Sequence, residues 1–177
     1  MEPKLIIICG NVGTGKSALA KALADKLDYA LLRFDDVMWS VSKKSMLFNT
    51  QDEFLLTLDE ILNVYREMCH RAAELLKQGK SVVLESMYFP EQRKEAVEMG
   101  KKYSKHVLLV HVTCNEQEVC KRIEERKKTN PQTPGVQQYH KWRSVFENVP
   151  DAELMIDTTN LTIEQELDLI LKHLHKY

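Results

Sequence analysis

Hydrophobic residues in this chain fall into short continuous runs that alternate with longer segments of helical spacing. The runs are apolar and rich in β-branched or aromatic residues, a pattern that predicts buried strands. They cover residues 4–9, 29–34, 81–85, 106–113 and 153–157. Segments with apolar residues every three or four positions predict helices. These cover residues 17–27, 52–78, 90–103, 116–128, 136–148 and 162–176. The alternation predicts an α/β domain with a five-stranded parallel sheet between two layers of helices.

Two stretches do not follow either period. Residues 37–50 place Trp39, Met46 and Phe48 among serines and lysines. This stretch is interpreted either as a mobile element that covers a substrate or as an irregular connection. Residues 130–135 contain two prolines and a glycine, which is typical of a loop. With 177 residues and no internal repeat, the whole chain, 1–177, is expected to form a single domain.

Composition narrows the classes of partner. The formal net charge is -1 and 29% of residues are charged, so the chain has no overall attraction to nucleic acid or to an anionic membrane. No apolar run approaches the roughly 18 residues of a membrane span, and the apolar run at 4–9 is interpreted as a strand and not a signal sequence. A cytoplasmic protein is therefore expected. The four cysteines lack metal-site spacing and are expected to be free thiols. The oligomeric state stays open.

A glycine-rich segment connects the first predicted strand to the first predicted helix. It matches the pattern G-x-x-x-x-G-K-[ST], and a strand before it and a helix after it are the context that this phosphate-binding motif requires. Its residues are Gly10, Asn11, Val12, Gly13, Thr14, Gly15, Lys16 and Ser17. Their backbone N–H groups can surround phosphate oxygens, and the helix adds its positive end. Lys16 would bind the β- and γ-phosphates and the Ser17 hydroxyl would bind Mg²⁺. The segment therefore predicts a site for ATP and Mg²⁺.

Two acids follow the second predicted strand. Asp35 and Asp36 stand where parallel α/β sheets place ligands, at the carboxyl end of a strand. A carboxylate there could bind an acceptor hydroxyl and take its proton, and Asp35 is the first candidate for this base, with Asp36 second. The alternative is structural, because acids after a strand can also cap the next helix.

Glu85 ends the third predicted strand. It could hold Mg²⁺ through water or contact the substrate, or it could be a strand-end carboxylate that faces solvent. Tyr88 follows in the same loop and could reach a substrate.

Two arginines stand one helical turn apart in the segment 116–128. Arg122 and Arg126 share a helix face just before the loop at 130–135. A lid covering about 116–148 could bring either guanidinium onto the charge that develops during phosphoryl transfer. The alternative is a solvated basic face whose cations pair with acids of the same helix.

Taken in order, these features resemble the P-loop kinases that include polynucleotide 5′-kinases, zeta-toxin-like kinases and chloramphenicol phosphotransferase. Phe34-Asp35-Asp36 resembles the strand-two motif of that group, which implies that Asp35 is the base. The segment from Arg122 to Arg126 resembles its lid pair. Ile156-Asp157-Thr158 resembles the strand before the adenine-contacting loop, which implies that Asp157 lies at the nucleotide. The resemblance covers nearly the whole chain and implies a three-layer P-loop fold with a small helical lid.

The acceptor half departs from that pattern. Polynucleotide kinases of the group usually carry an arginine where this chain has Met38, and Asp-x-Thr-Asn where it has the four residues from Glu85 to Tyr88. The sequence therefore predicts a kinase that moves the γ-phosphate of ATP to a hydroxyl of a small molecule. Two alternatives stay open: a polynucleotide 5′-hydroxyl kinase, and a nucleotide-binding ATPase or regulator without an acceptor. The choice between ATP and GTP also stays open.

Overall fold

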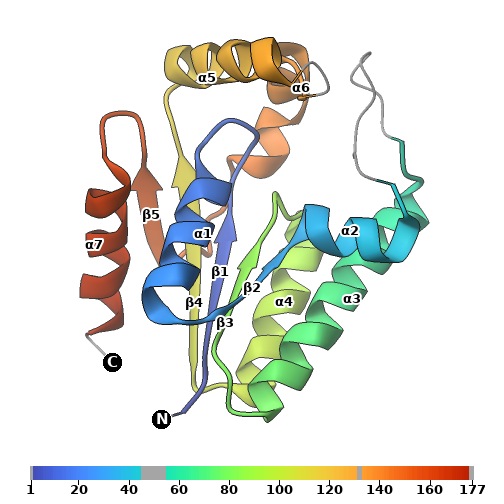
Figure 1. Ribbon diagram of the computed structural model, residues 1–177, viewed down its shortest axis with the longest axis vertical. Coiled ribbons are helices and arrows are strands. Elements are labelled where there is room, and N and C mark those ends of the chain that lie inside the picture. Colours follow the sequence, from blue (N-terminus) through green and yellow to red (C-terminus); the bar gives the residue numbers. More distant parts are fainter. Residues whose placement is uncertain (1, 45–54, 131–132, 176–177) are drawn as a thin grey trace.

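The structure is a computed structural model that describes residues 2–44, 55–130 and 133–175. Its centre is a five-stranded parallel sheet with the order β2-β3-β1-β4-β5 (Figure 1). The strands are β1 (Lys4–Cys9), β2 (Ala30–Arg33), β3 (Val82–Glu85), β4 (His106–Thr113) and β5 (Leu154–Asp157). Each lies within one of the five predicted runs, so the predicted sheet is confirmed.

The strands alternate with helices along the chain. These are α1 (Lys16–Leu27), α2 (Phe34–Ser42), α3 (Leu58–Lys77), α4 (Pro90–Tyr103), α5 (Glu116–Thr129), α6 (Val136–Phe146) and α7 (Ile163–Leu174). None of the helices in the described part of the chain is long and apolar enough to cross a membrane.

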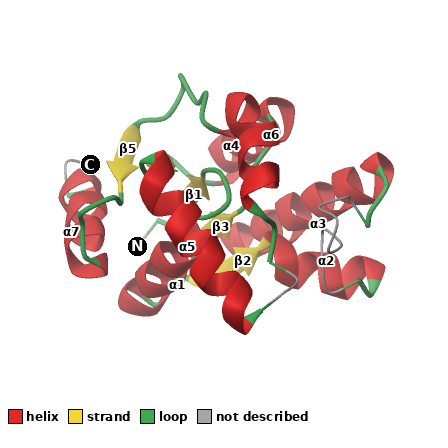
Figure 2. Cartoon of the chain, turned by 90° about the horizontal axis from the view of Figure 1, so that it is seen from above, coloured by secondary structure: helices red, strands yellow, loops and turns green. Residues whose placement is uncertain are grey.

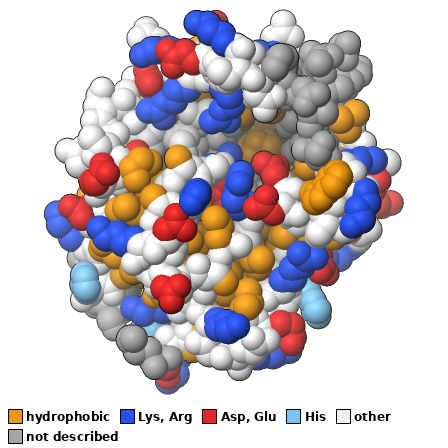
Figure 3. Space-filling view, viewed as in Figure 1, with side chains coloured by type: hydrophobic (Ala, Val, Ile, Leu, Met, Phe, Trp, Pro, Cys, Tyr) orange, Lys and Arg blue, Asp and Glu red, His pale blue; other side chains and the backbone are white. Residues whose placement is uncertain are grey.

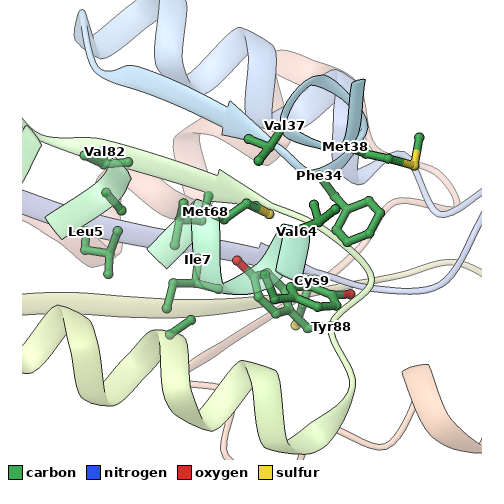
Figure 4. Packing of buried hydrophobic residues seen from close by; sticks show 14 of the residues in the cluster. Leu5, Ile7, Cys9, Phe34, Val37, Met38, Val64, Met68, Val82 and Tyr88 are labelled. Carbon is green, nitrogen blue, oxygen red and sulfur yellow. The ribbon is translucent and has the colours of Figure 1, made fainter. Parts of the chain in front are cut away.

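The two faces of the sheet build separate cores because side chains alternate along each strand. Ile6 and Ile8 of β1 pack on one face, in the cluster that α1 and α7 cover. Leu5 and Ile7 point to the other face, in the cluster that includes residues of α3 and α4 (Figure 4). The three predicted layers are confirmed. Strand β1, paired with β3 on one side and β4 on the other, places its carboxyl end at the middle of the sheet edge.

Two predicted boundaries move in the structure. Helix α2 begins at Phe34, immediately after β2, so residues 37–42 are helical and neither irregular nor loop-like. Positions 45–50 of the predicted irregular stretch lie outside the described residues. Helix α3 begins at Leu58 and not at 52, because the Thr57 side chain accepts from the Glu60 amide while the Glu60 carboxylate accepts from the Thr57 amide. This capping box defines the start of the helix.

Helices α5 and α6 lie over the carboxyl ends of the strands. Seen from above, α5 crosses the strand ends, with β5 and α7 on one side and α2 and α3 on the other (Figure 2). These two helices are the segment predicted as a lid. In the space-filling view, a recess lies between this layer and the sheet edge, with acidic and basic side chains together along its lower margin (Figure 3).

Candidate active site

The phosphate-binding motif forms the turn between β1 and α1. Gly13 and Gly15 have φ values of 80° and 94°, in the left-handed region that favours glycine. Gly15 is the N-cap of α1, so the helix begins at Lys16. A Cβ atom on Gly13 would lie 2.9 Å from Cγ1 of Val119 in α5. Glycine is therefore required here both by the backbone turn and by the close approach of the lid.

The lid helices pack directly on this turn. Val12, Val119, Ile123 and Tyr139 form a small buried cluster that joins the motif to α5 and α6. The buried Asn11 side chain donates to the backbone carbonyl of Tyr139 at 3.2 Å and accepts from the Val12 amide at 2.8 Å. The turn is thus supported by a polar contact and an apolar contact at adjacent positions.

Glu85 connects the motif to the neighbouring strands. Its side chain is only 5% exposed, and its Oε1 accepts a hydrogen bond from the Ser17 hydroxyl at 3.0 Å and lies 3.7 Å from the Lys16 ammonium. Its Oε2 accepts from Nε of Arg33 at 3.3 Å. A buried carboxylate needs such partners, because an unpaired charge in the interior is costly. Glu85 therefore lies at the phosphate-binding motif and is not a strand-end carboxylate that faces solvent.

Arg33 is the site residue that sequence reasoning missed. It ends β2, and its terminal nitrogens lie 3.8 Å from Asp35 and 3.9 Å from Asp36 in the first turn of α2. The available indication was a single cation at the end of an otherwise apolar strand, next to two acids. Met38, two residues after Asp36, is fully buried in the core. Its side chain therefore does not contribute to the site surface.

The environment of Asp35 favours a proton acceptor. The carboxylate keeps 63% of its side chain accessible, yet the surrounding protein displaces enough water to raise its pKa, and the nearby Glu85 charge raises that pKa further. Lys16 and Arg33 act in the opposite direction. A raised pKa makes a carboxylate a stronger base toward a hydroxyl proton. The position of Asp35 in the first turn of α2 is also compatible with the structural alternative.

Arg122 lies at the flank of the phosphate-binding motif. Its terminal nitrogens donate to the hydroxyl and the carbonyl of Thr158, both at 2.9 Å, and its Nε donates to Glu118 at 3.0 Å. The Thr158 hydroxyl donates in turn to the backbone carbonyl of Thr14 at 2.7 Å. A Cβ atom on Gly15 would lie 3.6 Å from the Arg122 guanidinium. The guanidinium is thus held within reach of a phosphate in the motif. Thr158 is a second residue that sequence reasoning did not select.

Three other predicted residues are not brought into the site by the contacts of the described residues. Arg126 is exposed one turn further along α5. Asp157 is exposed at the end of β5, and its carboxylate accepts from the amide and hydroxyl of Thr159, which lowers its pKa. Both retain their predicted roles only as expectations.

Tyr88 is the third of these residues, and the structure buries it. Its side chain is 1% exposed in the core cluster beside Cys9, and its ring lies 5.2 Å from that of Tyr65 (Figure 4). Packing of this aromatic surface against α3 outweighs the exposure that its loop position suggested. In this conformation Tyr88 supports the loop and is not open to a substrate.

The residues present suit Mg²⁺ together with a nucleotide. The Ser17 hydroxyl and the Glu85 carboxylate are adjacent oxygen donors of the kind that Mg²⁺ prefers. Among the residues that the structure describes, no group of three or more His, Cys, Asp or Glu could hold a metal alone. This agrees with the usual mode of Mg²⁺ binding, in which one or two protein ligands act together with substrate phosphates.

Comparison with known proteins also points to a nucleotide-binding fold. A family model described as an AAA domain matches residues 5–149. The chain belongs to the AAA domain family. Uncharacterized proteins of Mycobacterium bovis and Mycobacterium tuberculosis are 30% identical over 88 residues, which make up 48% of this chain. The match spans only 18% of the length of those relatives.

Solved structures share the fold along nearly the whole chain. A sugar kinase from Janibacter has a TM-score of 0.73 at 16% identity and covers 98% of this chain and 95% of its own. A gluconokinase from Sinorhizobium meliloti has a TM-score of 0.73 at 16% identity, covering 99% and 93%. The APS kinase of Mycobacterium tuberculosis, in complex with AMPPNP and APS, has a TM-score of 0.71 at 16% identity, covering 98% of both chains. The predicted P-loop kinase fold is confirmed. None of these three is a polynucleotide kinase, a zeta toxin or a chloramphenicol phosphotransferase.

Proposed function

We propose that the protein is an ATP- and Mg²⁺-dependent phosphotransferase that moves the γ-phosphate to a hydroxyl of a small molecule. The observation that carries this proposal is the position of Glu85. Its buried carboxylate contacts Lys16 and Ser17 of the phosphate-binding motif through one oxygen and Arg33 through the other. Arg33 in turn adjoins Asp35. One continuous set of charged groups therefore joins the phosphate site to a candidate base.

Each residue has a distinct role in the proposed reaction. The motif amides and Lys16 would hold the phosphates, and Ser17 with Glu85 would hold Mg²⁺, which would supply charge neutralisation at the phosphates. Asp35 orients the acceptor hydroxyl and takes its proton. Arg122 stabilises negative charge from the flank of the motif, and Arg126 could join it if the lid moves. The named neighbours support this reading, because a gluconokinase and an APS kinase act on small molecules.

Measuring ADP formation with and without candidate acceptors tests the proposal. We expect formation to depend on Mg²⁺ and to rise at least about tenfold with a suitable hydroxyl compound, because the base needs an acceptor proton. The Lys16→Ala protein is the control for contaminating activity. Turnover that Lys16→Ala abolishes but that no acceptor stimulates would instead identify an ATPase. Stimulation by a 5′-hydroxyl oligonucleotide, and loss of that stimulation with added salt, would identify a polynucleotide kinase.

A further inference from the structure

Among the residues that the structure describes, the proposed acceptor side of the site holds more acidic than basic groups. The Arg33 guanidinium lies among three carboxylates, 3.3 Å from Glu85, 3.8 Å from Asp35 and 3.9 Å from Asp36. Glu85 is nearly inaccessible, whereas the side chains of Asp35 and Asp36 are 63% and 67% exposed. An incoming acceptor therefore meets the two aspartates and the outer edge of Arg33.

Arg33, Asp35 and Asp36, which together form the outer edge of the proposed acceptor site, use only part of their hydrogen-bonding capacity. Arg33 donates through Nε to Glu85 at 3.3 Å, whereas its terminal nitrogens lie 3.8 Å from Asp35 and 3.9 Å from Asp36, beyond the roughly 3.5 Å at which an N–H···O contact ceases to be a hydrogen bond. Its terminal N–H groups therefore remain donors, and the two carboxylates remain acceptors. Donors and acceptors alternate over a few ångströms. A hydroxyl group is both a donor and an acceptor, so a compound with neighbouring hydroxyls matches this alternation.

An anionic acceptor fits the same edge poorly. Like charges a few ångströms apart near a protein surface repel one another, and opposite charges attract, more strongly the closer they lie. An anion bound to the terminal nitrogens of Arg33 would approach Asp35 and Asp36 at similar separations, so two repulsions would oppose one attraction. Lys16 is paired with Glu85 and is needed at the phosphates, and the Arg122 guanidinium is bonded to Thr158 and Glu118.

We propose that the acceptor is an uncharged compound with neighbouring hydroxyl groups. Arg33 donates to one hydroxyl oxygen and Asp36 accepts from the next, which places a hydroxyl at Asp35. Asp36 is then the residue that determines specificity, because its charge rejects anionic acceptors. The assignment rests on the proposed phosphotransferase function and deepens it.

Binding to the protein loaded with AMPPNP and Mg²⁺ tests the assignment without a need for turnover. Isothermal titration calorimetry would compare uncharged and anionic partners of similar shape: sorbitol with gluconate, ribose with ribose 5-phosphate, and glycerol with glycerate. We expect at least one uncharged compound to bind, and to bind about tenfold or more tighter than its anionic partner. The Asp36→Asn protein should reduce that preference by admitting the anion.

Asp25→Asn is the matched control, because Asp25 is an exposed acid, 66% accessible, in a surface pair with Lys21 on α1. Both variants should unfold at the temperature of the parent protein. Tighter binding of the anionic partner, or no binding by any uncharged compound up to millimolar concentrations, would overturn the acceptor assignment alone. Failure of AMPPNP itself to bind would overturn the proposed function and the assignment with it.

Discussion

The proposed nucleotide side and the proposed acceptor side of the site are built in different ways. On the nucleotide side, Arg122, Thr158 and Thr14 form a chain of hydrogen bonds of 2.7–2.9 Å, and Val12 packs against the lid. On the acceptor side, Arg33 approaches two exposed aspartates at 3.8–3.9 Å without a hydrogen bond. The first region is held in place before a ligand arrives, and the second retains free donors and acceptors.

The difference follows from what each side must recognise. A triphosphate has the same shape in every reaction, so backbone amides held in one geometry bind it well and lose little freedom on binding. The glycine-rich turn is fixed by hydrogen bonds to the rest of the protein, through the Asn11 side chain to Tyr139 and through the Thr14 carbonyl to Thr158. On the proposed acceptor side, Asp35 and Asp36 lie in the first turn of α2, so we expect a substitution there to change specificity without disturbing the phosphate turn.

The largest effect is expected from Lys16→Ala. Loss of the ammonium removes the charge that faces the β- and γ-phosphates, so phosphoryl transfer should fall by about 10³-fold and ATP should bind more weakly. Radiolabelled phosphate transfer and ATP titration measure the two quantities. Lys21→Ala, on the exposed face of the same helix, is the control. Unchanged transfer would show that phosphate binding lies elsewhere.

Asp35→Asn should separate the two sides. We expect ATP affinity to stay nearly constant while transfer falls about 10²-fold, because only the base is lost. In the parent protein, burial and the Glu85 charge raise the pKa of Asp35, so activity should fall with decreasing pH already above the ordinary aspartate range. The pH profile of kcat/KM measures this limb, which the variant should lack. Transfer that survives the substitution would exclude Asp35 as the base.

Thr158→Val should weaken the binding of ATP and leave the binding of the acceptor unchanged. The substitution keeps the shape of the side chain but removes the hydroxyl that links Arg122 to Thr14. A lost hydrogen bond of about 1 kcal/mol corresponds to a rise of roughly fivefold in the KM for ATP. The KM for the acceptor should not change. Thr113→Val is the matched control, since that hydroxyl donates to the backbone carbonyl of Ile156 within the sheet and, among the described residues, makes no hydrogen bond to a residue of the site. Equal effects on both substrates would mean that the two sides are not independent.

The smallest effect concerns Glu166, a buried acid in the first turn of α7. This side chain is buried, and burial raises its pKa from 4.5 to about 7, with a smaller opposing influence of Arg122. Because the folded pKa exceeds the ordinary value, the contribution of Glu166 to stability should be complete below about pH 5 and be lost as pH rises through about 7. Between these pH values the melting temperature of Glu166→Gln, relative to that of the parent protein, should therefore rise with pH. Glu164→Gln, an exposed change in the same helix, should retain the parent slope.

Local patterns were sufficient for most of the fold. The strand runs and helical periods predicted all five strands of the sheet and their alternation with helices, which implied that the strands are parallel. Both patterns depend only on residues close in sequence. Helix α2 was not predicted, and the start of α3 was placed too early, since the abrupt turn after Arg33 and the cap at Thr57 involve single residues that periodicity does not detect. Tyr88 was misplaced for a related reason: whether a loop aromatic is exposed depends on the helix that packs over it.

The sequence by itself determined the phosphate-binding turn, because glycines in the left-handed region, a lysine and a serine at fixed spacing between a strand and a helix leave one local geometry. Only the tertiary structure decided which distant side chains meet that turn. Glu85, Arg33 and Thr158 lie on three different strands or strand ends, and their contacts depend on the order of strands in the sheet. That order is set by the packing of helices on both faces, which brings together residues that no local pattern connects.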